Sequence, residues 1–234
     1  MSFQHAWNVS PQEAVAIQKR LADHVVSSGT PTNITRVAGV DVGFESNGEI
    51  TRAAVAVLSF PELELVESAI SRCATTFPYI PGLLSFREIP AVLEAIAKLT
   101  RPPELILCDG QGTAHPRRLG IASHLGLLLN LPTIGVGKSR LAGHARLPVS
   151  NEKGAWQLLF LNGDRVGAIL RTRPGVKPLY ISPGHLVGFD EAIEWTLLCT
   201  TRYRLPETTR WAHRIASGPP LRRPRNGEQT SIAY

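Results

Sequence analysis

The order of helix and strand signals along this 234-residue chain predicts an α/β fold, with a mixed β-sheet flanked by helices. Three strand-like segments follow one another early in the chain with only short connections, and strands joined in this way are antiparallel neighbours. From about residue 105 onward, apolar strand signals alternate with helical ones, which is typical of strands connected through helices that pack on the sheet. The sheet should therefore contain an antiparallel meander and also parallel strands.

The first expected element is a helix that begins after Ser10. Ser10 can cap the helix, Pro11 suits the first helical position and Glu13 completes a capping box. Apolar residues then recur at helical spacing as far as Val25, and we expect residues 27–29 to end the helix. The three strands of the meander are expected at 36–44, 52–60 and 63–73, with turns at Asn47-Gly48 and Pro61-Glu62.

A loop rich in proline and glycine, residues 75–82, separates the meander from the second half of the chain. A helix follows it, with apolar residues as far as Leu99, and the run Arg101-Pro102-Pro103 ends that helix. The later elements are expected as strands at 105–108, 132–136, 155–161, 165–170 and 179–182, and as helices at 119–129 and 189–199. We expect residues 1–217 to form a single domain and residues 218–234 to be a flexible basic tail.

Charge and cysteine content narrow the classes of function. The net charge of +6 and the pI of about 9.6 favour an anionic partner such as nucleic acid, although an ordinary basic protein fits equally well. Cys73, Cys108 and Cys199 lie in apolar segments without a CxxC pair, so we expect reduced core residues rather than disulfides or a zinc site. The chain shows no signal-peptide pattern and no apolar run near the roughly 20 residues of a membrane span, so we expect a cytoplasmic protein.

Two aspartates stand at the ends of apolar segments, and each is bracketed by glycines. Asp41 follows residues 37–40, and Asp109 follows residues 105–108. A carboxylate at the edge of a core is unfavourable unless a cation or donor compensates it, and hard divalent metals bind such oxygen ligands. With Glu88 as a third acid, the sequence predicts a metal site for chemistry on phosphate, the alternative being ordinary Asp-Gly turns. Neutralisation of the aspartates by lysine or arginine would contradict the metal hypothesis.

Basic and histidine side chains near these acids are candidates for contact with phosphate. His115 follows Asp109 in one loop, and Lys138 follows a short strand, where its ammonium can meet a phosphate. Both can equally be solvated loop residues, and the sequence leaves this open. Seven basic residues are candidates for a wider phosphate-binding rim, with scattered surface charge as the alternative: Arg117, Arg118, Lys138, Arg140, Arg171, Arg173 and Lys177.

The run Pro78-Tyr79-Ile80-Pro81 predicts a stiff, apolar loop, because its two prolines restrict the backbone. Exposed apolar side chains on such a loop can enter a base stack as a wedge, as enzymes that extrude a base require. The alternative is a buried loop that packs on the core. Spacing alone favours the buried loop.

Several motifs occur in a recognisable order along the chain. They are Ala38-Gly39-Val40-Asp41-Val42-Gly43, Pro78-Tyr79-Ile80-Pro81-Gly82, Phe86-Arg87-Glu88, Asp109-Gly110-Gln111-Gly112, His115-Pro116-Arg117-Arg118-Leu119-Gly120, Ile134-Gly135-Val136-Gly137-Lys138 and Arg204-Leu205-Pro206-Glu207-Thr208-Thr209-Arg210. Together the motifs resemble the endonuclease V family, also called deoxyinosine 3′ endonuclease, from about Gln12 to Ala216.

The resemblance implies a ribonuclease H-like fold and a DNA repair endonuclease. The implied reaction is a nick at the second phosphodiester bond 3′ to deoxyinosine, with the lesion left in place and water activated by Mg²⁺, for which Mn²⁺ is expected to substitute. DNA is the implied partner, and no obligate protein partner is expected for what should be a monomer. An endonuclease acting on inosine in RNA and a non-catalytic binder of distorted nucleic acid are the alternatives.

The resemblance also implies roles for individual residues. Asp41 and Asp109 would be metal ligands and Glu88 the third acid, with His115 and Lys138 assisting at the phosphate. The wedge would comprise Pro78, Tyr79, Ile80 and Pro81, and the pocket for the flipped base Gly82, Leu84, Gly112, Ile121 and Gly135. His213 would either bind metal or orient a water. Gln111 departs from the family pattern, in which His also occurs, but the flanking glycines are retained.

Overall fold

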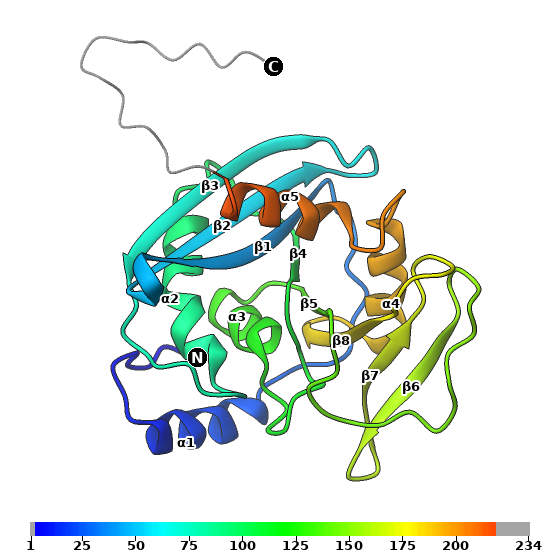
Figure 1. The fold of residues 1–234 in the computed structure, drawn as a ribbon, viewed down its shortest axis with the longest axis horizontal. Helices are drawn as coiled ribbons and strands as arrows, with labels where there is room; N and C mark the ends of the chain where they lie inside the picture. Colours follow the sequence, from blue (N-terminus) through cyan, green and yellow to red (C-terminus); the bar gives the residue numbers. More distant parts are fainter. Residues whose placement is uncertain (1–2, 219–234) are drawn as a thin grey trace.

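Eight strands form one mixed sheet in the order β3-β2-β1-β4-β5-β8-β7-β6, as the computed structural model shows for residues 3–218 (Figure 1). The strands are β1 (Arg36–Glu45), β2 (Ile50–Ser59), β3 (Leu65–Ala74), β4 (Leu105–Cys108), β5 (Thr133–Gly137), β6 (Trp156–Leu161), β7 (Asp164–Leu170) and β8 (Leu179–His185). The helices are α1 (Pro11–Ala22), α2 (Leu84–Ile96), α3 (Ile121–Leu129), α4 (Phe189–Leu198) and α5 (Glu207–Ala216). The expected α/β fold with a mixed sheet is confirmed.

Helices cover both faces of the sheet. Helices α2 and α3 pack on one face, where Ile89, Val92 and Leu125 lie in a core with Val55 and Ile106 of the strands. Helices α4 and α5 pack on the other face (Figure 1). Burial of two apolar layers against one sheet supplies the main stabilising free energy, because it removes apolar surface from water on both sides.

Strand β1 lies in the interior of the sheet, between β2 and β4. It pairs antiparallel with β2 through the tight turn Ser46–Gly48, and parallel with β4. In the parallel pair, Val40 is opposite Cys108, where β4 ends. The next residue of each strand is an aspartate, so the sheet brings Asp41 and Asp109 side by side.

Helix α1 ends earlier than its apolar spacing predicts. The capping box of Ser10 and Glu13 is present, but the helix ends at Ala22 rather than beyond Val25. The chain then turns toward β8, where the Val26 amide donates to His185 Nδ1 at 3.2 Å and its carbonyl accepts from Leu186 at 2.7 Å. These tertiary hydrogen bonds outweigh the local helical preference of the last apolar residues.

Helix α5 was not expected from the sequence. Its buried residues are small, namely Thr208, Thr209, Ala212 and Ala216, so it lacks the large aliphatic side chains of the buried faces of α2 and α3. Small side chains suit a helix that lies very close to β1 and β2. The approach is closest at Gly39, where an added methyl group would overlap the backbone of Thr208.

Gly39→Ala should therefore lower the free energy of unfolding by about 1–3 kcal/mol, because the added methyl group forces α5 away from β1. Chemical denaturation of the two proteins measures this difference. Gly43→Ala is the matched control on the same strand, because a methyl group there would lie 3.7 Å from the Ala216 carbonyl, an ordinary contact. Equal destabilisation by both substitutions would contradict the close approach at Gly39.

The remaining expectations for the chain have mixed outcomes. Cys73, Cys108 and Cys199 are free thiols, as expected. None of the helices within residues 3–218 combines the length and apolar character needed to cross a membrane. Nearly all of the tail predicted at 218–234 lies outside the described residues.

Candidate active site

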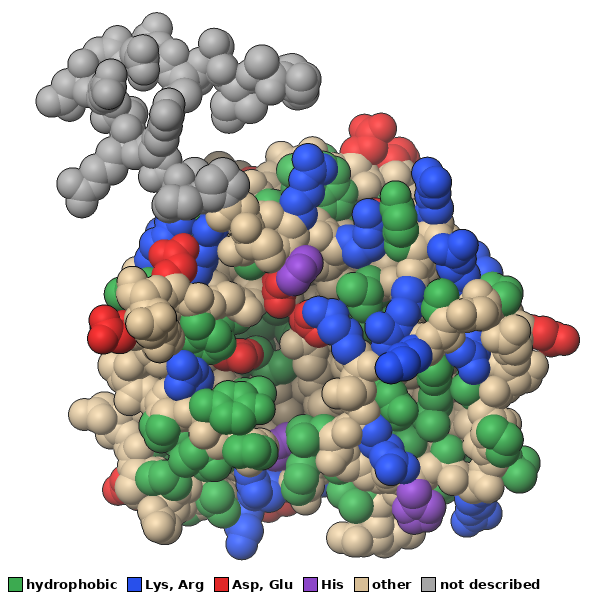
Figure 2. Space-filling model, in the orientation of Figure 1, with side chains coloured by type: hydrophobic (Ala, Val, Ile, Leu, Met, Phe, Trp, Pro, Cys, Tyr) green, Lys and Arg blue, Asp and Glu red, His purple; other side chains and the backbone are tan. Residues whose placement is uncertain are grey.

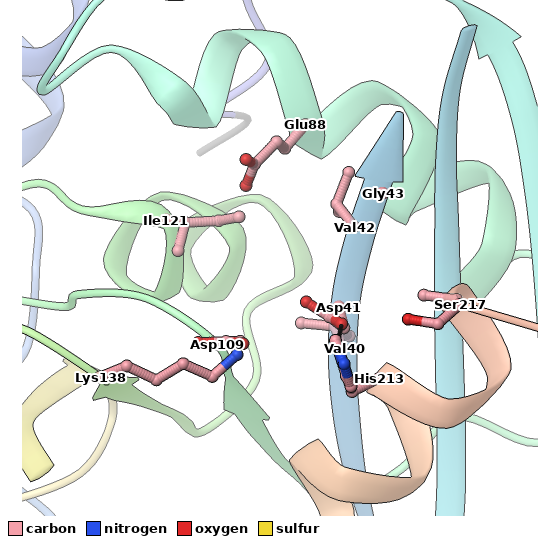
Figure 3. Close-up of a pocket in the computed structure, with 11 residues that line it drawn as sticks. Val40, Asp41, Val42, Gly43, Glu88, Asp109, Ile121, Lys138, His213 and Ser217 are labelled. Carbon is pink, nitrogen blue, oxygen red and sulfur yellow. Dashed lines mark hydrogen bonds and ion pairs between the residues drawn. The ribbon is translucent and has the colours of Figure 1, made fainter. Parts of the chain in front are cut away.

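Three acidic side chains face one pocket of about 380 Å³ near the middle of the sheet (Figure 3). Asp41 comes from β1, Asp109 from the end of β4 and Glu88 from α2. Helix α2 directs Glu88 toward the pocket because its neighbours Phe86 and Ile89 are fully buried against the core. The structure thus brings together the three acids that the sequence selects.

The environment of Glu88 strongly favours its neutral form. Burial, followed by the nearby charges of Asp41 and Asp109, raises the pKa of Glu88 to about 8. Within residues 3–218, no hydrogen bond or ion pair to the Glu88 carboxylate is found, so ionisation of Glu88 would add a negative charge beside two aspartates with no partner of its own to compensate it. A divalent cation is the kind of ligand that compensates such a charge.

The two aspartates do have partners in this structure. The ammonium of Lys138 forms an ion pair with Asp109, and burial raises the pKa of that carboxyl while Lys138 opposes the rise. His213 donates through Nδ1 to Asp41 Oδ2 at 2.7 Å. The carboxylates are well shielded, with 13% of the Asp41 side chain and 15% of the Asp109 side chain exposed.

These contacts bear directly on the metal hypothesis. Among the described residues, no three His, Cys, Asp or Glu side chains are close enough together to hold a metal ion. The condition that would contradict the hypothesis is met in part, because a lysine neutralises Asp109. Asp41 is instead paired with a histidine that is 58% exposed, and Glu88 forms no ion pair within residues 3–218. The chemistry of the three carboxylates fits a hard cation, provided that Asp109 exchanges Lys138 for it.

A second cavity of about 330 Å³ adjoins the acidic pocket and shares Glu88, Asp109 and Lys138 with it. Of the residues expected in a base pocket, Gly82, Leu84 and Ile121 line this cavity. The structure does not bring Gly112 and Gly135 to its wall. These two glycines lie where backbones cross, and an added methyl group at either position would overlap neighbouring main-chain atoms. Their role in the structure is close packing.

The loop before α2 is neither fully exposed nor fully buried. Tyr79 is 67% exposed and lines the second cavity together with Pro81. Ile80 instead packs against a small core that contains Phe77 and Leu83. Figure 2 shows apolar side chains gathered beside the central hollow, on the side of the segment that precedes α2. Of the four residues expected in the wedge, Pro78, Tyr79 and Pro81 are exposed, whereas Ile80 is partly buried against the core.

Comparison with known proteins gives a consistent result. The family model described as Endonuclease V matches residues 19–214 of the chain.

The chain belongs to the endonuclease V family.

A curated endonuclease V from Nostoc punctiforme is 56% identical over 214 residues, which span 91% of this chain and 96% of the relative. The crystal structure of endonuclease V from Streptomyces avermitilis is 44% identical, with a TM-score of 0.85 over 90% of this chain and 93% of that one. A Ciona intestinalis endonuclease V, solved with a 23mer DNA containing an inosine followed by a ribo-adenosine, is 26% identical, with a TM-score of 0.76 over 89% and 97% of the two chains. The acids described above thus belong to a nuclease family.

The hydrogen bonds of His115 differ from those expected of a side chain that contacts phosphate. Its Nε2–H donates to the Gly82 carbonyl at 2.9 Å, and its Nδ1 accepts from the Arg117 amide at 3.1 Å. Burial, and then the charge of Arg117, lower the pKa of His115 to about 4. Both ring nitrogens are therefore occupied in holding the loop at Gly82, and the ring is neutral.

The seven residues of the expected basic rim do not form one group. Lys138 and Arg140 line the second cavity of this endonuclease V chain. Arg117 donates to Gln18 and Gly82, Arg118 donates to the β6–β7 turn, and Arg171 donates to nearby carbonyls. Arg173 and Lys177 are exposed in the loop before β8. Figure 2 nevertheless shows Lys and Arg side chains gathered to the right of the hollow.

Two contributors to the site were not identified from the sequence. His213 was expected at the site from the resemblance, but helix α5, which carries it to Asp41, was not expected. Arg204 donates to the Lys138 carbonyl at 3.0 Å and to the Lys177 carbonyl at 2.7 Å, so it holds the loop that carries Lys138. The family motif 204–210 marks this region but does not by itself indicate what Arg204 contacts.

Proposed function

We propose that this protein is a Mg²⁺-dependent endonuclease that nicks DNA at the second phosphodiester bond 3′ to deoxyinosine and leaves the lesion in place. The observation that carries the proposal is the meeting of Asp41, Glu88 and Asp109 at a pocket that adjoins a second, partly apolar cavity. Membership of the endonuclease V family, and the inosine-containing DNA bound by the Ciona relative, support the choice of substrate.

The three carboxylates are the residues that would hold the metal. When bound, Mg²⁺ would supply an activated water and stabilise negative charge at the phosphate. Lys138 would then be released from Asp109, so that its ammonium is free to contact a phosphate oxygen. His213 donates to Asp41 through Nδ1, which orients that carboxylate and leaves Nε2 directed away from it.

The second cavity is the proposed site of the extruded base. Its volume of about 330 Å³ lies within the usual range of about 300–1,000 Å³ for small-ligand sites. Its wall combines apolar Leu84 and Ile121 with backbone at Gly82. A base seated there would place the phosphates of its own strand beside the acidic pocket, because the two cavities share Glu88, Asp109, Ile121 and Lys138.

The test is a gel assay of one duplex that carries a single deoxyinosine, with the nick mapped to nucleotide resolution. A nick at the second bond on the 3′ side that requires Mg²⁺ and stops with EDTA supports the proposal. Binding without strand cutting would support the non-catalytic alternative. Because the DNA bound by the Ciona relative contains a ribo-adenosine, the same assay on inosine-containing RNA separates a ribonuclease from a deoxyribonuclease.

Tyr79→Ala should weaken discrimination of inosine more than it weakens general affinity for DNA. The exposed ring can fill the space that an extruded base leaves, which offsets part of the unstacking free energy of a few kcal/mol. Affinities for matched duplexes with and without inosine, measured by fluorescence anisotropy, provide the comparison. Tyr203→Ala removes another exposed tyrosine, 42% exposed on the segment before α5, and is the control. Equal loss of affinity for both duplexes on Tyr79→Ala would contradict the wedge role.

A further inference from the structure

A row of three polar side chains connects the N-terminal segment to the second cavity. Ser85, in the first turn of α2, lines the cavity and is only 3% exposed. Its Oγ lies 3.0 Å from His124 Nδ1, and His124 Nε2 lies 2.7 Å from His5 Nε2. The function proposed above makes no use of these contacts.

The hydrogen positions along this row follow from its first member. His5 Nδ1 lies 2.8 Å from the Ala6 carbonyl oxygen, which can only accept, so Nδ1 must carry the hydrogen. A neutral imidazole has one N–H, which leaves a lone pair on His5 Nε2. His5 Nε2 therefore accepts a hydrogen bond, and the donor is His124 Nε2–H.

The same reasoning gives the direction of the hydrogen bond between His124 and Ser85. Since His124 is neutral and its hydrogen is on Nε2, its Nδ1 has a lone pair and accepts. The Ser85 hydroxyl must then donate its hydrogen to His124 Nδ1. Burial supports neutral rings, because it lowers the pKa of His124 to about 3 and holds the pKa of His5 below its ordinary value.

Aromatic packing keeps the two rings in place. Trp7 lies 4.4 Å from the His5 ring, and Phe86 lies 5.3 Å from the His124 ring, measured between centroids. His124 is fully buried, so water does not compete for its nitrogens. The row is therefore a rigid relay that determines the direction of the Ser85 hydroxyl.

We propose that Ser85 is a specificity-determining residue that offers only lone pairs to the base in the second cavity. This inference rests on the proposed function, because it assigns a base to that cavity. Hypoxanthine carries a hydrogen on N1, whereas adenine has a lone pair at the same position. The Ser85 hydroxyl donates its own hydrogen to His124, so toward the cavity it can only accept, and it can accept from the N1–H of hypoxanthine. Adenine would instead place its N1 lone pair against a lone pair of Ser85, which is repulsive.

The polarity of the relay can be tested without DNA. Long-range ¹H–¹⁵N correlation spectra of the uniformly labelled full chain distinguish the two neutral tautomers of histidine. We expect the Nε2–H tautomer for His124 and the Nδ1–H tautomer for His5. The Nδ1–H tautomer at His124 would overturn the proposal, because Ser85 would then accept and be free to donate into the cavity.

The specificity is tested by affinity rather than by cutting. Duplexes with one deoxyinosine or one deoxynebularine, whose N1 has no hydrogen, are bound in EDTA. We expect Ser85→Ala to lower the preference for inosine by roughly three- to tenfold, the effect of losing one hydrogen bond. An unchanged preference in Ser85→Ala would overturn the proposal.

Ser123→Ala is the matched control, because Ser123 is also fully buried, adjoins His124 and has an Oγ with no hydrogen-bond partner among the described residues. It should keep the preference for inosine at the wild-type value, and a loss equal to that of Ser85→Ala would overturn the proposal. Failure of the wild-type protein to nick an inosine duplex with Mg²⁺ would instead overturn the proposed function. The histidine tautomers and the binding preference for inosine in EDTA do not depend on that result.

Discussion

Replacing Asp41 or Asp109 with alanine should lower the rate of nicking of an inosine duplex by at least about 10³-fold, while affinity for the duplex stays within a few-fold of wild type. The two carboxylates lie side by side at the acidic pocket, and Glu88 is the only other acid among the described residues that line it. Their loss removes the charge that would hold the metal. Most of the affinity for DNA comes from contacts with the phosphate backbone and does not depend on them.

Single-turnover rates with saturating enzyme measure the chemical step, and anisotropy without metal measures affinity. Asp190→Ala is the matched control, because Asp190 is also paired with a cation, Arg165, but lies outside both cavities. It should nick at the wild-type rate. Cutting at the wild-type rate by either Asp41→Ala or Asp109→Ala would show that the metal assignment is wrong.

The acids could be predicted from the sequence because the cause of their proximity is local. Asp109 directly follows the apolar strand β4, whereas Asp41 lies within β1, which continues to Glu45. Parallel pairing of Val40 with Cys108 still places the two carboxylates together. The short turns of the meander likewise required β1 to pair with β2. In these cases the pattern of a few consecutive residues determines the structure.

Helix α5 and the Ser85 relay could not be predicted in this way. The buried face of α5 consists of threonine and alanine, whose size is selected by Gly39 on a strand far away in the sequence. The relay joins His5, Ser85 and His124 from three separate elements, and each residue on its own has no distinctive neighbours. Their meeting depends on the packing of α2 against α3 and of the N-terminal segment on both.

The pairing of Asp109 with Lys138 is a third case. Lys138 was selected as a phosphate contact from its place after a short strand, and β5 does pair with β4. Parallel pairing brings the ends of these strands together, so a cation after one strand meets an acid after the other. Lys138 compensates Asp109 in this structure, and under the proposed function the same ammonium would contact a substrate phosphate.

Glu88→Gln should abolish nicking and at the same time stabilise the metal-free protein. A carboxyl group whose pKa is raised from 4.5 to about 8 binds its proton more tightly in the folded state, so the free energy of unfolding falls as pH rises from 4.5 to 8. Glutamine has no charge to bury and avoids this loss. The gain of Glu88→Gln over wild type should be absent near pH 4.5 and reach on the order of 1–4 kcal/mol above pH 8.

Urea denaturation in EDTA at pH 5 and pH 9 measures the effect. The urea midpoint of Glu88→Gln should exceed that of wild type mainly at pH 9, and saturating Mg²⁺ should reduce the difference, because a cation stabilises the three carboxylates of wild type more than the two that remain. Glu94→Gln removes an exposed carboxylate from the same helix and should change the free energy of unfolding by less than about 0.5 kcal/mol. If Glu88→Gln is less stable than wild type at pH 9 without metal, the carboxylate is not under electrostatic strain, and the strongest physical argument for a cation at this pocket is lost.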